Sequence, residues 1–162
     1  MRQFNGMASF AEHLLTLMAA EEIASRAALG KCARLVEKTA KDKIGEYQEQ
    51  TGPFIAWPEL AESTKADRVA HGFTEDEPLL RTGDMRDSIS HVISTSGLEA
   101  QIGSNDDKAV WQELGTQHIP PRSFLGGAVS DKLPEIKEIL AGSLVAALVG
   151  EKVVEGGLLI EG

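Results

Sequence analysis

The side chains that could perform chemistry are scattered along this chain, and none of them has the spacing that catalysis or metal binding requires. No two of the four histidines are separated as metal ligands on one helix face would be (His13, His71, His91 and His118). The stretch Ser104–Asp107 has only two carboxylates, on adjacent residues, which is too few for a calcium loop. Asp84 and Asp87 flank Arg86, and a helix-capping role accounts for them. We therefore predict no metal site and no cofactor.

Candidate nucleophiles also lack a catalytic setting. Cys32 is the only cysteine, so an intramolecular disulfide or a Cys-rich zinc site is impossible, and we expect Cys32 to be a small buried residue. A hydrolase built from Ser123, His118 and Glu113 is a distant alternative, because the order and spacing of these residues specify nothing. The sequence has no nucleophile elbow and no phosphate-binding glycine loop. We predict no catalytic residues and no enzymatic activity.

The composition of the chain further limits the class of protein to which it can belong. The 162 residues, 42% hydrophobic, predict one domain over residues 1–162. A net charge of −9 opposes adhesion to phosphate backbones, so we do not expect direct, sequence-specific nucleic-acid binding. The longest apolar run, Leu144–Val149, is far shorter than the roughly 20 residues that cross a bilayer, so we expect a soluble, intracellular protein that does not enter membranes.

Residues 1–44 are dominated by a helical pattern. Apolar residues recur at three- and four-residue steps from Ser9 to about Ile44, and Ser9 with Glu12 resembles a capping box. A straight helix of this length would reach roughly 50 Å, against a radius of gyration near ~15 Å for a compact domain of this size. Two alternatives follow: the helix bends near Gly30, or it projects and packs on a neighbouring subunit.

Residues 45–80 have the Pro and Gly dipeptides of a loop region, with one short helix predicted over Glu59–Ala70. Phe54 and Trp57 lie in this loop. Either they pin the loop to the domain surface, or they anchor a partner, since Trp is frequent among interface hot spots.

Residues 81–150 are expected to contain the sheet and the remaining helices. Thr82 is a candidate N-cap, and a β-hairpin is predicted from strands at 89–95 and 98–102, in which Leu98, Ala100 and Ile102 share the buried face. Asp106 or Asp107 should cap a helix that ends at Gly115 in a left-handed conformation.

The end of the chain is predicted to contain an extended arm, a helix and a tail. Ile119–Phe124 is predicted to form an edge strand or a strand-like arm, because it contains two prolines. A helix is predicted from about Ser130 to Val149, with Pro134 near its first turn. Residues 151–162 are predicted to form a flexible tail. The predicted fold is α+β: a small antiparallel sheet built on a hairpin and packed against a long N-terminal helix and a C-terminal helix.

An ordered series of short motifs spans Ile44–Ala128, about half of the chain. Each motif is weak alone, but their order and spacing together resemble the neck and tail-completion proteins of tailed bacteriophages, also described as virion-morphogenesis or minor tail proteins. One departure is Ser123, where relatives often have Pro. The motifs are Ile44-Gly45-Glu46-Tyr47-Gln48, Gly52-Pro53-Phe54, Trp57-Pro58-Glu59-Leu60, Thr64, Pro78-Leu79-Leu80-Arg81-Thr82-Gly83, Arg86-Asp87-Ser88-Ile89, Ile102-Gly103, Ala109, Gln112-Glu113-Leu114-Gly115-Thr116 and Pro121-Arg122-Ser123-Phe124-Leu125.

This resemblance implies a structural subunit of the phage or prophage head-tail junction, assembled as a ring of copies in contact with portal, head-closure or tail proteins. It would be found in the virion, and in the host cytoplasm during assembly. Surplus carboxylates could line a DNA channel and discourage DNA from adhering. The competing interpretation is a non-phage protein-binding module.

Five residues are our candidates for contacts with another subunit or partner, or for holding the loops that make those contacts: Phe54, Trp57, Trp111, Arg122 and Phe124. For Trp111 and Phe124, an ordinary place in the core is an equal alternative. Arg122 is the stronger interface candidate, because a guanidinium can donate several hydrogen bonds to a carboxylate or to the backbone.

Overall fold

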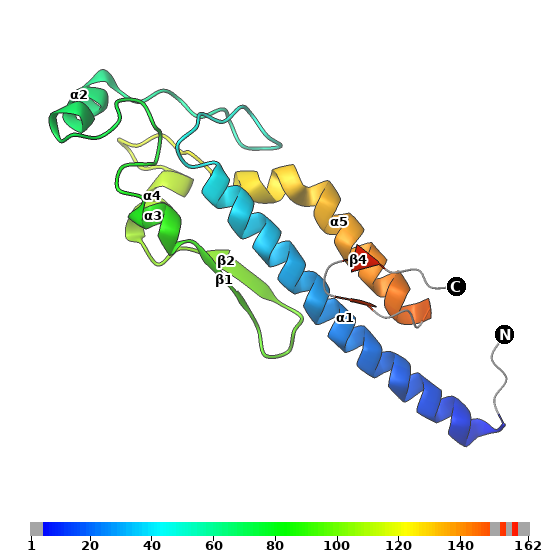
Figure 1. The fold of residues 1–162 in the computed structure, drawn as a ribbon. Helices are drawn as coiled ribbons and strands as arrows, with labels where there is room; N and C mark the ends of the chain where they lie inside the picture. The colour runs from blue at the N-terminus through cyan, green and yellow to red at the C-terminus, as the bar shows by residue number, and fades with distance from the viewer. Residues whose placement is uncertain (1–4, 150–152, 155–156, 159–162) are drawn as a thin grey trace. The chain divides into compact units, whose positions relative to one another are not determined.

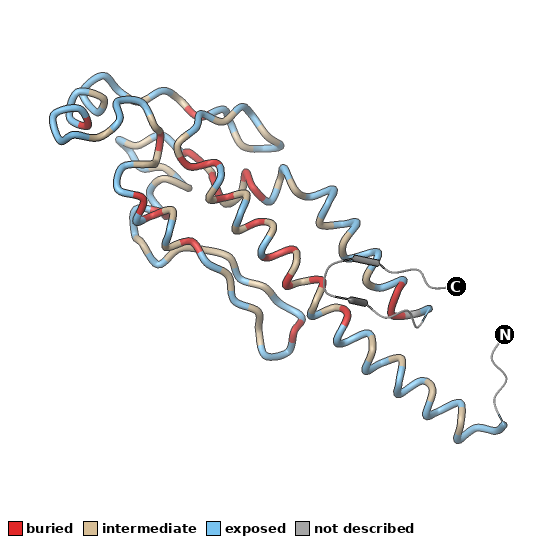
Figure 2. Tube along the Cα trace, viewed as in Figure 1, coloured by how far each residue is buried: buried red, intermediate tan, exposed pale blue. Residues whose placement is uncertain are grey.

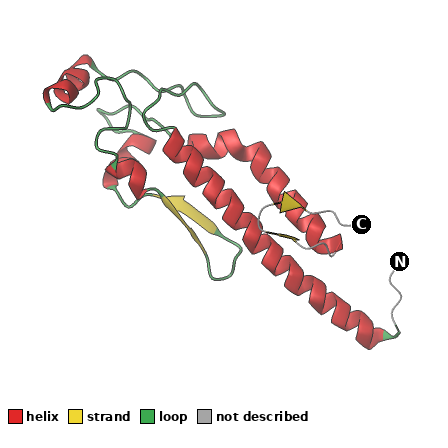
Figure 3. Cartoon of the chain, viewed as in Figure 1, coloured by secondary structure: helices red, strands yellow, loops and turns green. Residues whose placement is uncertain are grey.

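The computed structural model describes residues 5–149, 153–154 and 157–158. The predicted α+β class is confirmed, with a long N-terminal helix, a two-stranded antiparallel sheet and a C-terminal helix (Figures 1 and 3). None of the helices in the described part is both long enough and apolar enough to cross a membrane. The elements are, in order, α1 (Met7–Asp42), α2 (Glu62–Ala70), α3 (Asp84–Ser88), β1 (Ser90–Ile93), β2 (Ala100–Gly103), α4 (Asp107–Leu114), α5 (Leu125–Val149), β3 (Val153–Val154) and β4 (Gly157–Leu158).

The chain divides into two compact units, and both α1 and α5 contribute residues to each of them. Unit 1 comprises the described residues of Met1–Cys32, Ile93–Ala100 and Glu135–Gly162. Unit 2 comprises Ala33–Val92 and Gln101–Pro134. The assignment of residues 1–162 to a single domain stays a prediction.

Helix α1 confirms the long predicted helix and continues without interruption through Gly30, which is buried. The predicted capping box was wrong. The helix begins at Met7, so Ser9 lies inside its first turn, and the Ser9 hydroxyl donates a hydrogen bond to the Gly6 carbonyl (2.9 Å). Gly6 has a φ of 124°, a conformation that favours glycine and leads the chain into the helix.

The two halves of α1 differ in burial. No residue from Met7 to Ile23 is buried, whereas small side chains are buried at every fourth position from Ala24 onward (Figure 2). In unit 1, α1 meets α5 at Ala24, whose carbonyl accepts a hydrogen bond from the Ser143 hydroxyl (2.8 Å), and Ala146 and Ala147 of α5 are also buried. Small side chains on both helices allow this close packing. The buried positions of α1 at this step are Ala24, Ala28, Cys32, Val36 and Ala40.

The hairpin is confirmed, but one of its predicted core residues was placed wrongly. Strands β1 and β2 pair in a two-stranded sheet, and Gly97 supplies the positive φ (70°) in their connection. Leu98 precedes β2 instead of belonging to it, and 72% of its surface is exposed. The predicted strands leave only residues 96–97 between them, whereas the segment that connects β1 and β2 spans residues 94–99.

Two of the predicted starts of helices α2 to α4 differ from those in the structure, and the third agrees. Helix α2 begins at Glu62 instead of Glu59. Gly83, with a φ of 93°, occupies the N-cap position of α3 that we assigned to Thr82. By contrast, Asp106 caps α4 as predicted, since its side chain accepts a hydrogen bond from the Lys108 backbone N–H (2.9 Å).

Helix α5 begins at Leu125, five residues before its predicted start. Pro134 is therefore an interior residue of the helix, and its predicted place in the first turn was wrong. An interior proline lacks the N–H that the helix ladder uses and typically costs ~3 kcal/mol. The early start of α5 is due to the side chain of Glu113, whose hydrogen bonds to the first residues of the helix are described below.

The predicted tail, residues 151–162, falls mostly outside the described residues. Its described part forms two short strands, in which Val153 pairs with Leu158 and Val154 with Gly157 in antiparallel register. The flexibility of this tail stays a prediction. The pairing of the two strands was missed because strands of two residues carry no periodic signal.

Candidate interaction site

The five candidate contact residues all belong to unit 2, but only some of them are exposed. Phe124, Trp57 and Arg122 are buried, and Phe124 is one of the largest fully buried side chains among the described residues. Phe54 is half-buried, and Trp111 is 50% exposed. Of the alternatives for Trp111 and Phe124, the core position therefore holds for Phe124 and not for Trp111.

The carboxylate of Glu113, near the end of α4, accepts hydrogen bonds from three consecutive backbone N–H groups where α5 begins. The donors are Phe124 (2.8 Å), Leu125 (2.9 Å) and Gly126 (2.9 Å). The first N–H groups of a helix have no partner within the helix, and a negative charge there is favourable. We call this arrangement the Glu113 clasp, and it explains why α5 begins before its predicted start.

Further bonds join the end of α4 to the arm that precedes α5. The Ser123 hydroxyl donates to the Glu113 carbonyl (3.1 Å), and the Arg122 N–H donates to the Gln112 carbonyl (2.6 Å). Gly115 lies between the two segments with φ 76° and ψ 172°. Its φ is positive as predicted, but its ψ is extended and not that of the left-handed helix. The arm is thus fixed by α4 rather than by a neighbouring strand.

The glycine at position 126 makes room for Phe54. A β-carbon added at Gly126 would overlap the end of the Phe54 ring and would lie 3.1 Å from Glu113 Oε1. Gly126 belongs to the first turn of α5, and its lack of a side chain permits this close approach. Phe54 therefore covers the first turn of α5 beside the clasp.

Arg122 holds a loop of its own chain. Its guanidinium donates to the Pro58 carbonyl from Nη2 (2.7 Å) and Nε (3.2 Å), and to the Glu59 carbonyl from Nη2 (3.2 Å). Burial lowers the pKa of Arg122, since desolvation disfavours the charged form. The hydrogen bonds that we expected Arg122 to offer a partner are thus made within the chain, and among the described residues no carboxylate pairs with it.

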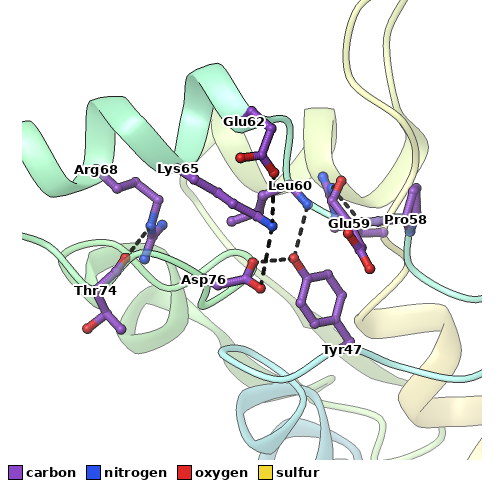
Figure 4. Close-up of polar contacts among 10 residues, drawn as sticks. Tyr47, Pro58, Glu59, Leu60, Glu62, Lys65, Arg68, Thr74 and Asp76 are labelled. Atoms are coloured by element: carbon purple, nitrogen blue, oxygen red, sulfur yellow. Dashed lines mark hydrogen bonds and ion pairs between the residues drawn. The ribbon is translucent and has the colours of Figure 1, made fainter.

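Arg68, on α2, repeats this arrangement. Its burial was not predicted, since arginine is usually exposed. Its guanidinium donates from Nε to the Thr74 carbonyl (2.7 Å; Figure 4). It also donates from Nη2 to the Leu80 carbonyl (2.5 Å), and the two bonds fix the loop after α2. Arg68 also forms no ion pair within the described part of the chain. Unit 2 therefore contains two buried guanidinium groups whose partners are all backbone carbonyls.

A third polar cluster fixes the region before α2. The Tyr47 hydroxyl donates to Asp76 Oδ1 (2.5 Å) and accepts from the Leu60 N–H (3.0 Å), and Lys65 Nζ lies 3.7 Å from Asp76 Oδ2 (Figure 4). Burial and the hydrogen bond to Asp76 raise the pKa of Tyr47. The residues predicted as loop, 45–80, are in this way connected to one another by side chains.

A cavity of about 490 Å³ in unit 2 is lined by both buried guanidinium groups and by Trp111. Two further cations line it, and each has a carboxylate partner: Arg81 Nη2 lies 3.1 Å from Asp67 Oδ2, and Lys108 Nζ lies 3.9 Å from Asp106 Oδ2. The lining also has an apolar part, made of Leu60, Leu79 and Met85. We call this cavity the cationic pocket.

Two of the three side chains of the alternative hydrolase, Glu113 and Ser123, make contacts within unit 2. The Glu113 carboxylate forms the clasp, and the Ser123 hydroxyl donates to the Glu113 carbonyl. Of the histidines, His91 has its Nδ1 2.5 Å from Glu37 Oε2. Within the described residues, no group of three or more His, Cys, Asp or Glu side chains is arranged to hold a metal ion. No protein-family model, no curated protein and no solved structure matches this chain.

Proposed function

We propose that this chain is a structural subunit of the head-tail junction of a tailed phage or prophage, a neck or tail-completion protein that assembles with copies of itself into a ring. The ordered motifs of the sequence support this proposal. So does the way they contact one another: the Gln112-Glu113 motif binds the Arg122–Leu125 motif through the clasp, and Arg122 binds the Trp57-Pro58-Glu59 motif.

The observation that carries the proposal is the exposed apolar face of α1. Met7 is 80% exposed, Met18 is 67% exposed, and Phe10 and Leu14 are also exposed. Together with Leu17, these residues recur at three- and four-residue steps, which is the spacing that helices use to pack on other helices. Exposed apolar faces of this extent mark interaction surfaces, because covering each large side chain is worth about 1.5–3 kcal/mol.

A second apolar surface in unit 1 makes another copy of the chain a suitable partner. The last turns of α5, Ile139–Val149, contain no charged residue and expose Leu144, Val145 and Val149. From Met7 to Ser25, α1 likewise contains no Lys or Arg. Two different patches on one chain are the requirement for a heterologous interface, which closes into a ring when the rotation between copies allows it.

Native mass spectrometry and negative-stain imaging over a range of concentrations test the ring. Leu14→Asp places a charge on the apolar face and should reduce the assembly to monomers. Thr16→Asp is the matched control, since two residues rotate the helix by about 200° and place the charge on the opposite side. Equal assembly of both variants would contradict this use of α1.

The genes that flank this one test the phage assignment separately, because such subunits can stay monomeric until they meet the portal or tail. Capsid, portal and tail genes alongside would support the head-tail junction. A monomer that binds a single partner, encoded away from any such genes, would favour the non-phage binding module instead.

A further inference from the structure

The cationic pocket has a charge opposite to that of the whole chain. The protein has a net charge of −9, but the pocket is lined by Arg68, Arg81, Lys108 and Arg122 against a single carboxylate, Asp84. Asp84 is itself occupied by the Thr82 hydroxyl (2.7 Å). Arg81 and Lys108 have Asp67 and Asp106 as partners, so the positive charge without a carboxylate partner in the described residues is that of Arg68 and Arg122.

Two of these cations are buried without a counter-ion. Arg68 and Arg122 donate only to backbone carbonyls within the described residues. A buried charge whose neighbours are only neutral dipoles retains a desolvation cost that an opposite charge can offset. An anionic group that enters the pocket would supply that charge.

The other residues that line the pocket indicate which groups the ligand has besides its anionic group. Leu60, Leu79 and Met85 provide apolar contacts, and the half-exposed Trp111 provides an aromatic one. Gln112 also lines the pocket, and its Oε1 is a buried acceptor without a donor in the described part of the chain. A ligand with carboxylates, an apolar side chain and N–H donors matches all three features, and a peptide segment has all of them.

From these observations we propose that the cationic pocket binds an acidic peptide segment of a partner protein other than this chain. A second copy is disfavoured because the like net charges of two copies oppose an ionic contact. The same repulsion acts on a long nucleic acid, whose phosphates meet the field of the whole chain, whereas a short segment with two or three carboxylates meets chiefly the local charge of the pocket.

Titration calorimetry with the full chain and a synthetic probe tests this proposal. The probe is the blocked peptide Leu-Glu-Asp-Glu, and its uncharged analogue Leu-Gln-Asn-Gln is the control. We expect the acidic peptide to bind, its affinity to fall as salt is added, and the analogue to bind at least about tenfold more weakly, since charge-assisted hydrogen bonds are lost. Equal binding of the two peptides, or no binding of either, would overturn the proposal.

Variants locate the binding in the pocket. Lys108→Gln should weaken the acidic peptide by up to about fivefold, the usual upper limit for an exposed charge pair. Lys137→Gln removes an exposed lysine of α5 that does not line the pocket, and it should change nothing. Trp111→Ala should weaken binding by about tenfold or more, as truncated aromatic anchors do. Denaturation curves show whether each variant is folded.

Two other ligands serve as counter-tests. Tighter binding of inorganic phosphate or of a short single-stranded oligonucleotide than of the acidic peptide would identify a phosphate site and overturn the proposal. Loss of self-association in Lys108→Gln would make a second copy the occupant and would overturn it as well. Because this site lies in unit 2 and the ring surfaces lie in unit 1, failure of one proposal leaves the other unaffected.

Discussion

The Glu113 clasp and the first half of α1 differ in whether their groups find partners within the chain. Around the clasp, three N–H groups, a guanidinium and a hydroxyl all find partners in the same chain. From Met7 to Ile23 the helix has an apolar pattern but no buried residue. The clasp is complete in a single chain, whereas the apolar face of α1 has surface left for another molecule.

This difference predicts different consequences of mutation. Removal of a partner of a buried polar group lowers the stability of the single chain, by about 1–3 kcal/mol for each group left unsatisfied. A polar substitution on an exposed face changes little in the free chain, usually within about 0.5 kcal/mol. Stability measurements therefore report on the clasp, and assembly measurements report on α1.

Glu113→Ala should have the largest effect. It leaves three N–H groups at the start of α5 without their acceptor, and we expect a loss of about 3 kcal/mol in the free energy of unfolding. Chemical denaturation monitored by circular dichroism measures this loss. Glu138→Ala, at an exposed position of α5, is the matched control and should stay within about 0.5 kcal/mol of the parent. Similar values for the two variants would show that the clasp contributes little.

Arg122→Lys should have the next largest effect. Lysine keeps the charge but cannot reproduce the fork that donates to the Pro58 and Glu59 carbonyls, so we expect a loss of about 2 kcal/mol. Limited proteolysis of the segment around Pro58 should accelerate at the same time. If Arg122→Ala leaves stability, oligomer size and particle joining unchanged, both the structural and the interface roles of Arg122 fail.

Two glycines of α5 should respond in opposite directions to the same substitution. Gly126→Ala forces the added methyl group against the Phe54 ring and should cost about 1–2 kcal/mol. Gly142→Ala has nothing within 4 Å of the added carbon and should stabilise the helix by about 0.5–1 kcal/mol. Thermal unfolding of both variants measures this difference, and a stabilising Gly126→Ala would contradict the packing around the clasp.

The smallest effect should be the pH dependence due to Glu37. Hydrogen bonds from Lys41, and then from His91, lower the pKa of Glu37 below its ordinary value of 4.5. A carboxylate with a lowered pKa in the folded state adds stability above 4.5, and this stability is lost as the pH falls through the lowered pKa. Partial exposure limits the contribution to less than about 1 kcal/mol. In acid titrations, Glu37→Gln should reduce the difference in stability between neutral and acid pH, and an unchanged difference would exclude Glu37 as its source.

Local patterns were sufficient to predict the elements whose signals lie within one segment. The long helix follows from the apolar spacing of α1, and the cap of α4 follows from Asp106. The glycine in the hairpin connection was likewise predictable, because few other residues adopt a positive φ.

Contacts between remote segments could not be predicted in this way. The start of α5 depends on Glu113, ten or more residues away in the sequence, and no helix-capping rule extends over that distance. The burial of Arg68 and Arg122 contradicts the usual exposure of arginine and is explained only by the carbonyl groups that the fold brings to them. The cationic pocket was missed for the same reason.

The burial of Cys32 has a practical consequence for labelling experiments. Desolvation raises the pKa of its thiol, which keeps the reactive thiolate scarce at neutral pH, and the chain has no second cysteine. A cysteine introduced at the exposed position of Met18 would therefore react almost alone with a maleimide dye. Fluorescence energy transfer between differently labelled copies could then follow the approach of one α1 to another without removal of any native residue from the core.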